Sequence, residues 1–385
     1  MPTAGRAGTR VLHLVVPGGI DDPGSPSGGN TYDRRIRDGL RALGWTVHQH
    51  PVAGTWPTPA VDHRAALARV LEALPDEGSV LVDGLVGCGV PEVLAPRAGR
   101  LVVLVHLPLG DEVGAAPDLA ERERVALHAA RAVVVTSPWA ARRVLEVHAL
   151  PPDRVHVVRP GTDPAAPPPA SPAIRVGESR NLCRRVPQPV SASPAIRAEP
   201  ATGAGRRLLC VGALTPTKGQ DVLVEALALV RNRVWSCDLV GPPRNPRFVA
   251  DLGRALARHG LRDRIRLLGP LPAENRYPDV DLLVLPSRAE TYGMVITEAL
   301  ARGVPVIASE VGGVPETLGR APDGARPGLL VPAADPEALA STLRRWFDDG
   351  GLRTELRTAA ARRRETLDGW EVTARCLADV LTRLR

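Results

Sequence analysis

The sequence has few aromatic residues and no long apolar run. Its 385 residues include only 6 Trp, 3 Tyr and 2 Phe, whereas proteins that bind single-stranded nucleic acid need aromatic side chains on which bases stack. No uninterrupted apolar stretch approaches the roughly 20 residues that span a bilayer, and Met1–Arg10 lacks the apolar core of a signal peptide. We therefore expect no nucleic-acid partner and a cytoplasmic protein.

Cysteine is also scarce. The five cysteines are Cys88, Cys183, Cys210, Cys237 and Cys376. Because their number is odd and no C-x-x-C pair occurs, neither a disulfide framework nor a structural zinc site is expected. This number and spacing of cysteines fit a protein in a reducing compartment.

Lysine is almost absent, although the chain is basic. The formal net charge is +7, yet 48 of the 49 basic residues are arginine and the one lysine is Lys218. The positive balance favours anionic partners, such as phosphorylated small molecules or the inner face of an anionic membrane, so peripheral membrane contact stays open. Lys218 marks a candidate position that needs a compact ammonium group; chance survival on a solvated face is the alternative.

Short apolar runs alternate with helical patterns in two separate parts of the chain. In the first part, strands are predicted around Arg10–Val16, Trp45–His48, Ser79–Asp83, Leu101–Val105, Ala132–Thr136 and Arg154–Val158. In the second part, they are predicted around Arg207–Val211, Trp235–Val240, Ile265–Leu268, Asp281–Leu285, Pro305–Ala308 and Leu329–Val331. Helical patterns, for example Pro138–His148 and Pro246–His259, lie between these runs, and this alternation implies parallel sheets covered on both faces. The predicted fold class is α/β, with two Rossmann-like doubly wound domains that face each other across a cleft.

Composition sets the domain boundaries. Residues 1–159 form the predicted N-terminal domain, and residues 206–368 form the predicted C-terminal domain. Residues 160–205 are dense in Pro, Ala and Ser and contain the sequence SPAIR twice, so we interpret them as a linker with a low-complexity insertion. Residues 369–385 contain a last helix, which is predicted to pack back toward the N-terminal domain.

Two features of the first domain are candidates for ligand contact. Gly28 and Gly29 lie between the first strand and a helix predicted over Thr31–Leu43, where glycines let backbone N–H groups approach an anion; a plain tight turn is the alternative. No complete G-x-G-x-x-G occurs, so nicotinamide binding is disfavoured. His106 ends a predicted strand, and strand C-terminal ends face the ligand crevice of a doubly wound domain; a structural histidine is the alternative.

The second domain carries two further motifs. Gly212–Gly219, which contains Lys218, connects a strand to a helix where a phosphate would lie. Glu290 and Glu298 are eight residues apart, which is about two helical turns, and a helix is predicted over Tyr292–Arg302, so they lie on roughly one face. Two carboxylates suit hydrogen bonds to sugar hydroxyls, and Gly293 lets amides near the helix start reach a phosphate. The alternatives are a helix N-terminal charge for Glu290 and a solvated helix face for Glu298.

These motifs resemble those of family 4 glycosyltransferases, which have the GT-B architecture. The most specific agreement is E-x7-E at Glu290–Glu298, together with G-x-L-x-x-x-K-G at Gly212–Gly219. Gly28-Gly29, His106 and Val311–Glu316 agree more loosely. The resemblance covers nearly the whole chain outside the insertion.

The resemblance implies a role for each matched residue. Glu298 would bind the ribose hydroxyls of a nucleotide-diphosphate sugar, and Glu290 would contact hydroxyls of the transferred sugar. Lys218 would neutralise the pyrophosphate, and His106 would lie beside the donor sugar near the reacting carbon. The implied donor-binding set is completed by Gly28, Gly29, Gly212, Gly293, Met294 and Val295.

The resemblance also implies a reaction. Family members retain the anomeric configuration and need no metal ion or cofactor, because fixed cations and helix N-termini stabilise the developing charge. The implied function is transfer of a sugar to a small-molecule or lipid acceptor bound by the N-terminal domain. At Ala213, however, relatives commonly carry an arginine. Two alternatives stay open: a catalytically silent nucleotide-sugar-binding protein, or another GT-B enzyme such as a nucleotide-sugar epimerase.

Overall fold

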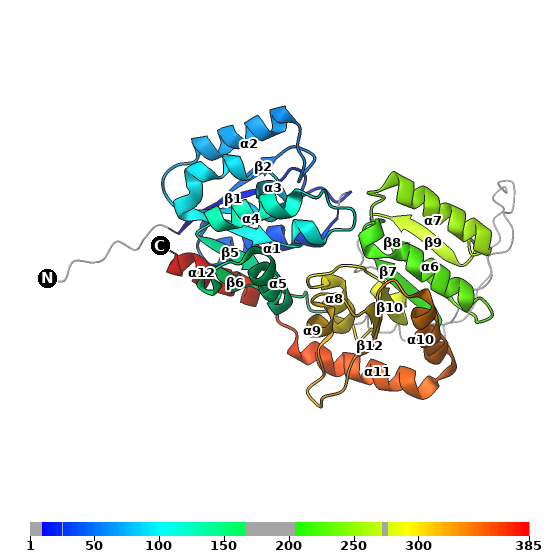
Figure 1. Ribbon diagram of the computed structural model, residues 1–385. Coiled ribbons are helices and arrows are strands. Elements are labelled where there is room, and N and C mark those ends of the chain that lie inside the picture. Colours follow the sequence, from blue (N-terminus) through cyan, green and yellow to red (C-terminus); the bar gives the residue numbers. More distant parts are fainter. Residues whose placement is uncertain (1–9, 25, 166–204, 272–275, 385) are drawn as a thin grey trace, which may run out of the picture.

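Two α/β domains, each built around a parallel sheet, make up the computed structural model (Figure 1). The structure describes residues 10–24, 26–165, 205–271 and 276–384. The predicted low-complexity insertion within residues 160–205 lies almost entirely outside the described residues. The two sheets and their covering helices confirm the predicted pair of doubly wound domains.

The N-terminal sheet has six parallel strands. In spatial order they are β2 (Thr46–Val52), β1 (Val11–Pro17), β3 (Ser79–Asp83), β4 (Leu101–Val105), β5 (Ala132–Val135) and β6 (Val155–Val157). The inner strands β3 and β4 are buried along their whole length, as expected for apolar strands covered on both faces. The strand order reverses between β1 and β3, and ligands bind doubly wound sheets at the C-terminal ends beside such a switch point.

Helices from both ends of the chain cover this sheet. They are α1 (Gly28–Ala42), α2 (Val61–Ala73), α3 (Gly84–Gly87), α4 (Leu119–Ala129), α5 (Pro138–His148) and α12 (Trp370–Arg383). The last helix, α12, packs against α1 in the N-terminal domain (Figure 1). Gly39 permits this close approach, because a Cβ there would lie 2.6 Å from the Cβ of Ala374. Leu377 shares one buried core with Ile36 of α1.

The C-terminal domain repeats the plan. Its sheet is also parallel, in the order β12 (Gly328–Val331), β11 (Val306–Ser309), β10 (Leu282–Leu285), β7 (Arg207–Val211), β8 (Ser236–Val240) and β9 (Ile265–Gly269). The covering helices are α6 (Gln220–Leu229), α7 (Pro246–His259), α8 (Met294–Ala301), α9 (Val314–Leu318), α10 (Pro336–Asp348) and α11 (Gly350–Arg363). The order reverses between β10 and β7, so the loops after these two strands meet at one edge of the sheet.

Two helix starts differ from the sequence prediction. The helix predicted to begin at Thr31 begins at Gly28, because the Ser27 side chain accepts a hydrogen bond from the Asn30 N–H at 3.0 Å and caps the first turn. Gly28 and Gly29 are therefore helical and do not form a loop. The helix predicted from Tyr292 begins at Met294, because Gly293 has a left-handed φ of 80° that a helix cannot include.

The chain crosses between the domains at two adjacent places. Thr162 N donates to Asp368 O at 2.9 Å, which joins the outgoing and returning segments. Gly161 lies against the returning segment so closely that a Cβ would be 2.4 Å from Trp370 N. None of the helices in the described ranges has the length and apolarity that a membrane-spanning helix needs.

Candidate active site

Lys218 and Glu290, which are 72 residues apart, form an ion pair in the C-terminal domain. The Lys218 Nζ atom lies 2.7 Å from Glu290 Oε2. Lys218 ends a short 3-10 turn after β7. The turn closes on Gly219, where φ is 68° and a Cβ would lie 2.0 Å from Pro286 O, so only glycine fits. Glu290 lies in the loop between β10 and α8.

A pair of glycines fixes the loop that carries Glu290. Gly313 N donates to the backbone oxygen of Glu290 at 3.0 Å. A Cβ at Gly312 would lie 1.9 Å from that same oxygen, so the loop could not approach a larger residue. The Val311–Glu316 segment, which matches the family only loosely, therefore fixes the backbone position of Glu290, the first residue of the E-x7-E motif.

The start of α8 faces the first turn of α1 in the other domain. A Cβ at Gly28 would lie 3.6 Å from the Met294 sulfur, so these two predicted donor-binding residues lie on the facing sides of the two domains, which we call the two walls of the candidate site. Met294 and Val295 are the first residues of α8. Their N–H groups have no acceptor within the helix, as in the first turn of any helix, and are suited to an anion.

Glu298 lies further along α8 and is held by a buried tyrosine. The Tyr277 hydroxyl lies 3.1 Å from Glu298 Oε2 and 3.3 Å from the backbone oxygen of Val295. Tyr277 is buried, and the Arg302 guanidinium lies 5.0 Å from the centre of its ring. Sequence reasoning missed Tyr277, because no motif marks it and its approach to Glu298 depends on the packing of α8.

Ala213 leaves the turn after β7 without a second cationic side chain. Arg288 lies nearby, since its backbone N–H donates to the backbone oxygen of Thr217 at 2.8 Å. Its guanidinium, however, donates to both carboxylate oxygens of Asp221, at 2.8 and 2.7 Å. Arg288 is therefore committed to an ion pair within its own domain.

His106 directly follows β4 and lies on the wall of the site that belongs to the N-terminal domain. Its backbone oxygen accepts a hydrogen bond at 2.5 Å from the Thr291 hydroxyl, and Thr291 follows Glu290 in sequence. A Cβ at Gly29 would lie 3.2 Å from His106 Cδ2, so the first turn of α1 packs against the imidazole. The structure thus brings His106 and Gly29 to the wall that faces Lys218 and Glu290.

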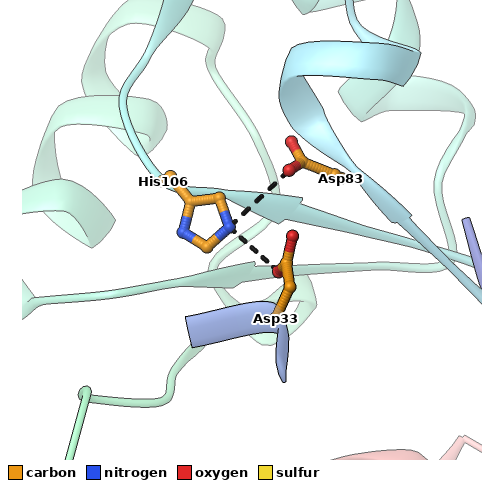
Figure 2. A group of neighbouring side chains, drawn as sticks. All are labelled: Asp33, Asp83 and His106. Atoms are coloured by element: carbon orange, nitrogen blue, oxygen red, sulfur yellow. Dashed lines mark hydrogen bonds and ion pairs between the residues drawn. The ribbon is translucent and has the colours of Figure 1, made fainter. Parts of the chain in front are cut away.

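Two buried aspartates meet the His106 ring, as Figure 2 shows. Nε2 lies 3.1 Å from Asp33 Oδ1 and 3.8 Å from Asp83 Oδ2. Asp33 belongs to α1, and Asp83 ends β3, the strand beside β4. Sequence reasoning missed both, although each left a signal: Asp33 falls on the apolar stripe of α1, and Asp83 is the polar end of an apolar strand.

The charges of this cluster depend on one another. Burial raises the pKa of Asp83 to about 7, and the neighbouring Asp33 charge adds to the effect. Burial alone would lower the pKa of His106, but the Asp33 and Asp83 carboxylates raise it to about 8. One potential ligand atom from each of the three side chains lies within 4.8 Å of the other two, a spacing that would also allow a metal ion to bind. We interpret the cluster as a hydrogen-bonded imidazolium, which supplies the positive charge itself; the expectation that no metal is bound stays a prediction.

The two walls touch through several polar contacts. The Ser137 hydroxyl donates to Thr291 O at 2.7 Å, and Trp139 N donates to Glu316 Oε2 at 3.0 Å. Val113 N lies 3.4 Å from the Thr217 hydroxyl, next to Lys218. A separate cavity of about 110 Å³ lies at the domain crossing and is lined by Arg159, Tyr292 and Arg363 among others, but not by Lys218, Glu290 or His106.

Sequence comparison places this chain among known proteins. The family described as "Glycosyl transferases group 1" matches residues 205–349. A D-inositol 3-phosphate glycosyltransferase from Xylanimonas cellulosilytica is 30% identical over 356 residues, which cover 88% of this chain and 72% of the relative. The chain belongs to glycosyltransferase family 4.

Other family 4 relatives are longer than the matched region. The D-inositol 3-phosphate glycosyltransferase from Thermobispora bispora is 32% identical over 76% of this chain. The chain spans 65% of that relative, and 57% and 62% of those from Jonesia denitrificans and Kineococcus radiotolerans.

Solved structures share the fold of this family 4 chain. Sucrose-phosphate synthase from Thermosynechococcus elongatus has a TM-score of 0.73 at 20% identity, and the match covers 97% of this chain and 99% of the other. Anabaena Alr3699/HepE in complex with UDP-glucose has a TM-score of 0.69 at 17% identity and covers 97% of this chain and 99% of its own. Both likenesses agree with the GT-B architecture of two Rossmann-like domains.

Proposed function

We propose that this protein transfers a sugar from a nucleotide-diphosphate sugar to a hydroxyl group of a small-molecule or lipid acceptor. The reaction proceeds with retention of the anomeric configuration and without a metal ion or cofactor. The observation that carries the proposal is the Lys218–Glu290 ion pair, which lies at the start of α8 and opposite His106.

The donor would be bound by residues from both walls. The pyrophosphate would compete with Glu290 for Lys218 and take the free N–H groups at the starts of α8 and α1. Glu290, once released, would accept hydrogen bonds from hydroxyls of the transferred sugar. Glu298 would hold the ribose, because Tyr277 fixes its carboxylate.

Retention without a metal ion has a physical basis in this site. Lys218 and the His106 imidazolium supply fixed positive charge where the leaving phosphate develops negative charge. In a front-face reaction, that phosphate can itself accept the proton of the acceptor hydroxyl. No protein base is then required.

The relatives suggest which ligands to test first. Those named above are D-inositol 3-phosphate glycosyltransferases, so inositol 3-phosphate is the first acceptor for the N-terminal domain. UDP-glucose, which is present in the structure of a fold neighbour, is the first donor. A lipid acceptor would bring the protein to the inner membrane face, which co-sedimentation with anionic vesicles measures.

The decisive experiment has two stages. A thermal-shift panel of nucleotide-diphosphate sugars identifies the donor, because a ligand at 100 times its dissociation constant adds about 2.7 kcal/mol to stability. Nucleoside-diphosphate release in the presence of EDTA then measures turnover, and NMR of the product gives the anomeric configuration. An inverted product, or turnover that EDTA abolishes, would contradict the corresponding part of the proposal.

A second candidate is a nucleotide-sugar-binding protein without turnover. Two observations favour this candidate. Position 213 is alanine, and Arg288 forms an ion pair with Asp221, so Lys218 has no second cation beside it in the turn after β7. Loss of one such stabilising group typically costs on the order of 10²–10³ in rate. A thermal shift without any nucleoside-diphosphate release, by transfer or by slow hydrolysis, would support this candidate.

A further inference from the structure

Asp33 and Asp83 meet the ring of His106 from two different elements. Both carboxylates are buried beneath the cleft wall, so neither can touch a ligand. In an inference that rests on the proposed function, we propose that Asp33 is a positioning residue. Its carboxylate fixes the His106 ring with Nε2–H toward α1 and leaves Nδ1 as the nitrogen that meets the ligand.

The ring is confined on three sides. Asp33 and Asp83 lie at Nε2 (Figure 2). The Tyr32 ring meets the imidazole edge to face, with centroids 5.3 Å apart. Gly29 closes the Cδ2 side, where even a methyl group would come within 3.2 Å. A ring flip would therefore exchange the Asp33 hydrogen bond for an apolar contact.

The remaining nitrogen, Nδ1, points away from the two carboxylates (Figure 2). It has no hydrogen-bond partner in the described part of the chain, and it is not among the buried atoms there that lack one. The side chain of His106 is 20% exposed. When one imidazole nitrogen is fixed by a hydrogen bond, the other is the one presented to a ligand.

The charges of Asp33 and Asp83 also determine whether Nδ1 of His106 accepts or donates a hydrogen bond. A neutral ring with its proton on Nε2 would offer Nδ1 only as an acceptor, whereas the imidazolium offers an N–H donor. Asp33 and Asp83 are the charged groups that act on the ring, and they raise its pKa to about 8. Below that pH, the ring presents a donor and a positive charge to the sugar or the leaving phosphate.

NMR of the histidine ring nitrogens tests the arrangement without any substrate. The His106 signal, identified by its loss in His106→Asn, is expected to titrate near pH 8, with the neutral ring protonated on Nε2. Asp33→Asn should lower the midpoint by about one pH unit or more. The control Asp38→Asn, on the same helix but exposed, should leave it unchanged. A wild-type midpoint at or below 6.5, or no change in a folded Asp33→Asn, overturns the proposal.

A kinetic double-mutant cycle tests the consequence. With the donor identified above, Asp33→Asn should lower kcat roughly tenfold or more and leave the donor KM nearly unchanged, since small misplacements of a reacting group are costly. In the His106→Asn background, the same substitution should cause no further loss. An equal loss in both backgrounds overturns the proposal. If the wild type turns over no nucleotide sugar, the proposed function fails while the NMR titration still decides the role of Asp33.

Discussion

Lys218 Nζ and Glu290 Oε2 are 2.7 Å apart, so the one lysine of the chain is neutralised by the first glutamate of the E-x7-E motif. Both side chains are partly buried, with 30% of Lys218 and 13% of Glu290 exposed. A pyrophosphate carries more negative charge than one carboxylate, so it can replace Glu290 as the partner of Lys218. The pair keeps the cation in place until the donor arrives.

Lys218→Arg should lower turnover about 10²-fold, although it keeps the charge. The lysine stem packs against Gly212, where a Cβ would lie 3.4 Å from Lys218 Cγ, and a planar guanidinium is wider than an ammonium. Misplacement of the phosphate by about 1 Å has a cost of this size. Nucleoside-diphosphate release measures turnover, and thermal melting should change little. Wild-type turnover in this variant would mean that Lys218 survived by chance.

Glu290→Gln and Glu298→Gln should separate sugar binding from nucleotide binding. Because Glu298 is assigned to the ribose, its substitution should weaken free nucleoside diphosphate and donor alike, by roughly tenfold. Because Glu290 is assigned to the sugar and competes with the pyrophosphate for Lys218, its substitution should leave free nucleotide affinity unchanged or raise it, while turnover falls. Calorimetric titration with the nucleoside diphosphate checks both, and equal losses would contradict the assignment.

Tyr277→Phe should weaken nucleotide binding through Glu298. The substitution removes only the hydroxyl that lies 3.1 Å from Glu298 Oε2, and a hydrogen bond to a charged group contributes about 1.5–3 kcal/mol. In the Glu298→Gln background the effect should largely disappear. Additive losses in the double variant would show that Tyr277 acts elsewhere.

Gly29→Ala should impair turnover more than Gly28→Ala. A methyl group at position 29 would meet the His106 ring at 3.2 Å, whereas one at position 28 would meet the flexible Met294 side chain at an ordinary 3.6 Å. Both positions lie in the first turn of α1, so the helix itself gains from alanine in each case. A comparison of kcat for the two variants checks this matched pair, and equal values would contradict it.

The stability of the wild type should fall as pH rises from 6 to 9. Burial raises the pKa of Asp83 to about 7 from an ordinary 3.8, and its carboxylate neighbours raise that of His106 to about 8 from 6.5. The folded state therefore holds extra protons that it loses in this range, and stability decreases with pH wherever the folded state binds more protons. Asp83→Asn, which resembles the protonated acid, should show a smaller fall.

Differential scanning fluorimetry across that pH range makes the comparison. The wild-type midpoint should drop by several degrees, since about 1 kcal/mol corresponds to roughly 2–4 °C for a domain of about 150–250 residues. Asp153→Asn, at the start of a surface 3-10 turn, serves as the control and should follow the wild type. An equal fall in Asp83→Asn would show that Asp83 does not titrate in this range.

Much of the fold could be predicted from the sequence, because residues that favour a helix start stand where the packed helices begin. The helices Pro138–His148 and Pro246–His259 match their predicted ranges, since each begins with proline after a capping side chain, Ser137 or Asn245. No range was predicted for the helix α2, in which only Leu67 and Leu71 are buried, so that its apolar stripe is narrow. Gly28 was predicted to lie in a loop, but it is helical because the cap at Ser27 extends α1 by one turn.

The candidate site was predictable only where a motif, or for His106 the end of a predicted strand, marked a residue. Glu290, Glu298 and Lys218 stand in recognisable spacings, and the structure brings Glu290 to Lys218. Asp33 and Tyr277 act through partners that are distant in sequence, and spacing carries no information about such approaches. Asp33 could have been suspected as a carboxylate on an apolar helical stripe, where a buried charge requires a partner.

The path of the chain also sets the order in which the two domains can fold during synthesis. Residues 205–368 form one continuous stretch, so the second domain can complete its core as soon as that stretch has left the ribosome. The first domain must wait, because its α1 buries Ile36 in a core that includes Leu377 of α12. Until residues 370–383 are made, one apolar face of the earlier-synthesised domain stays uncovered, and the contacts that cover it join the most distant parts of the chain. Completion of the first domain is thus expected to be the late step in the folding of this protein.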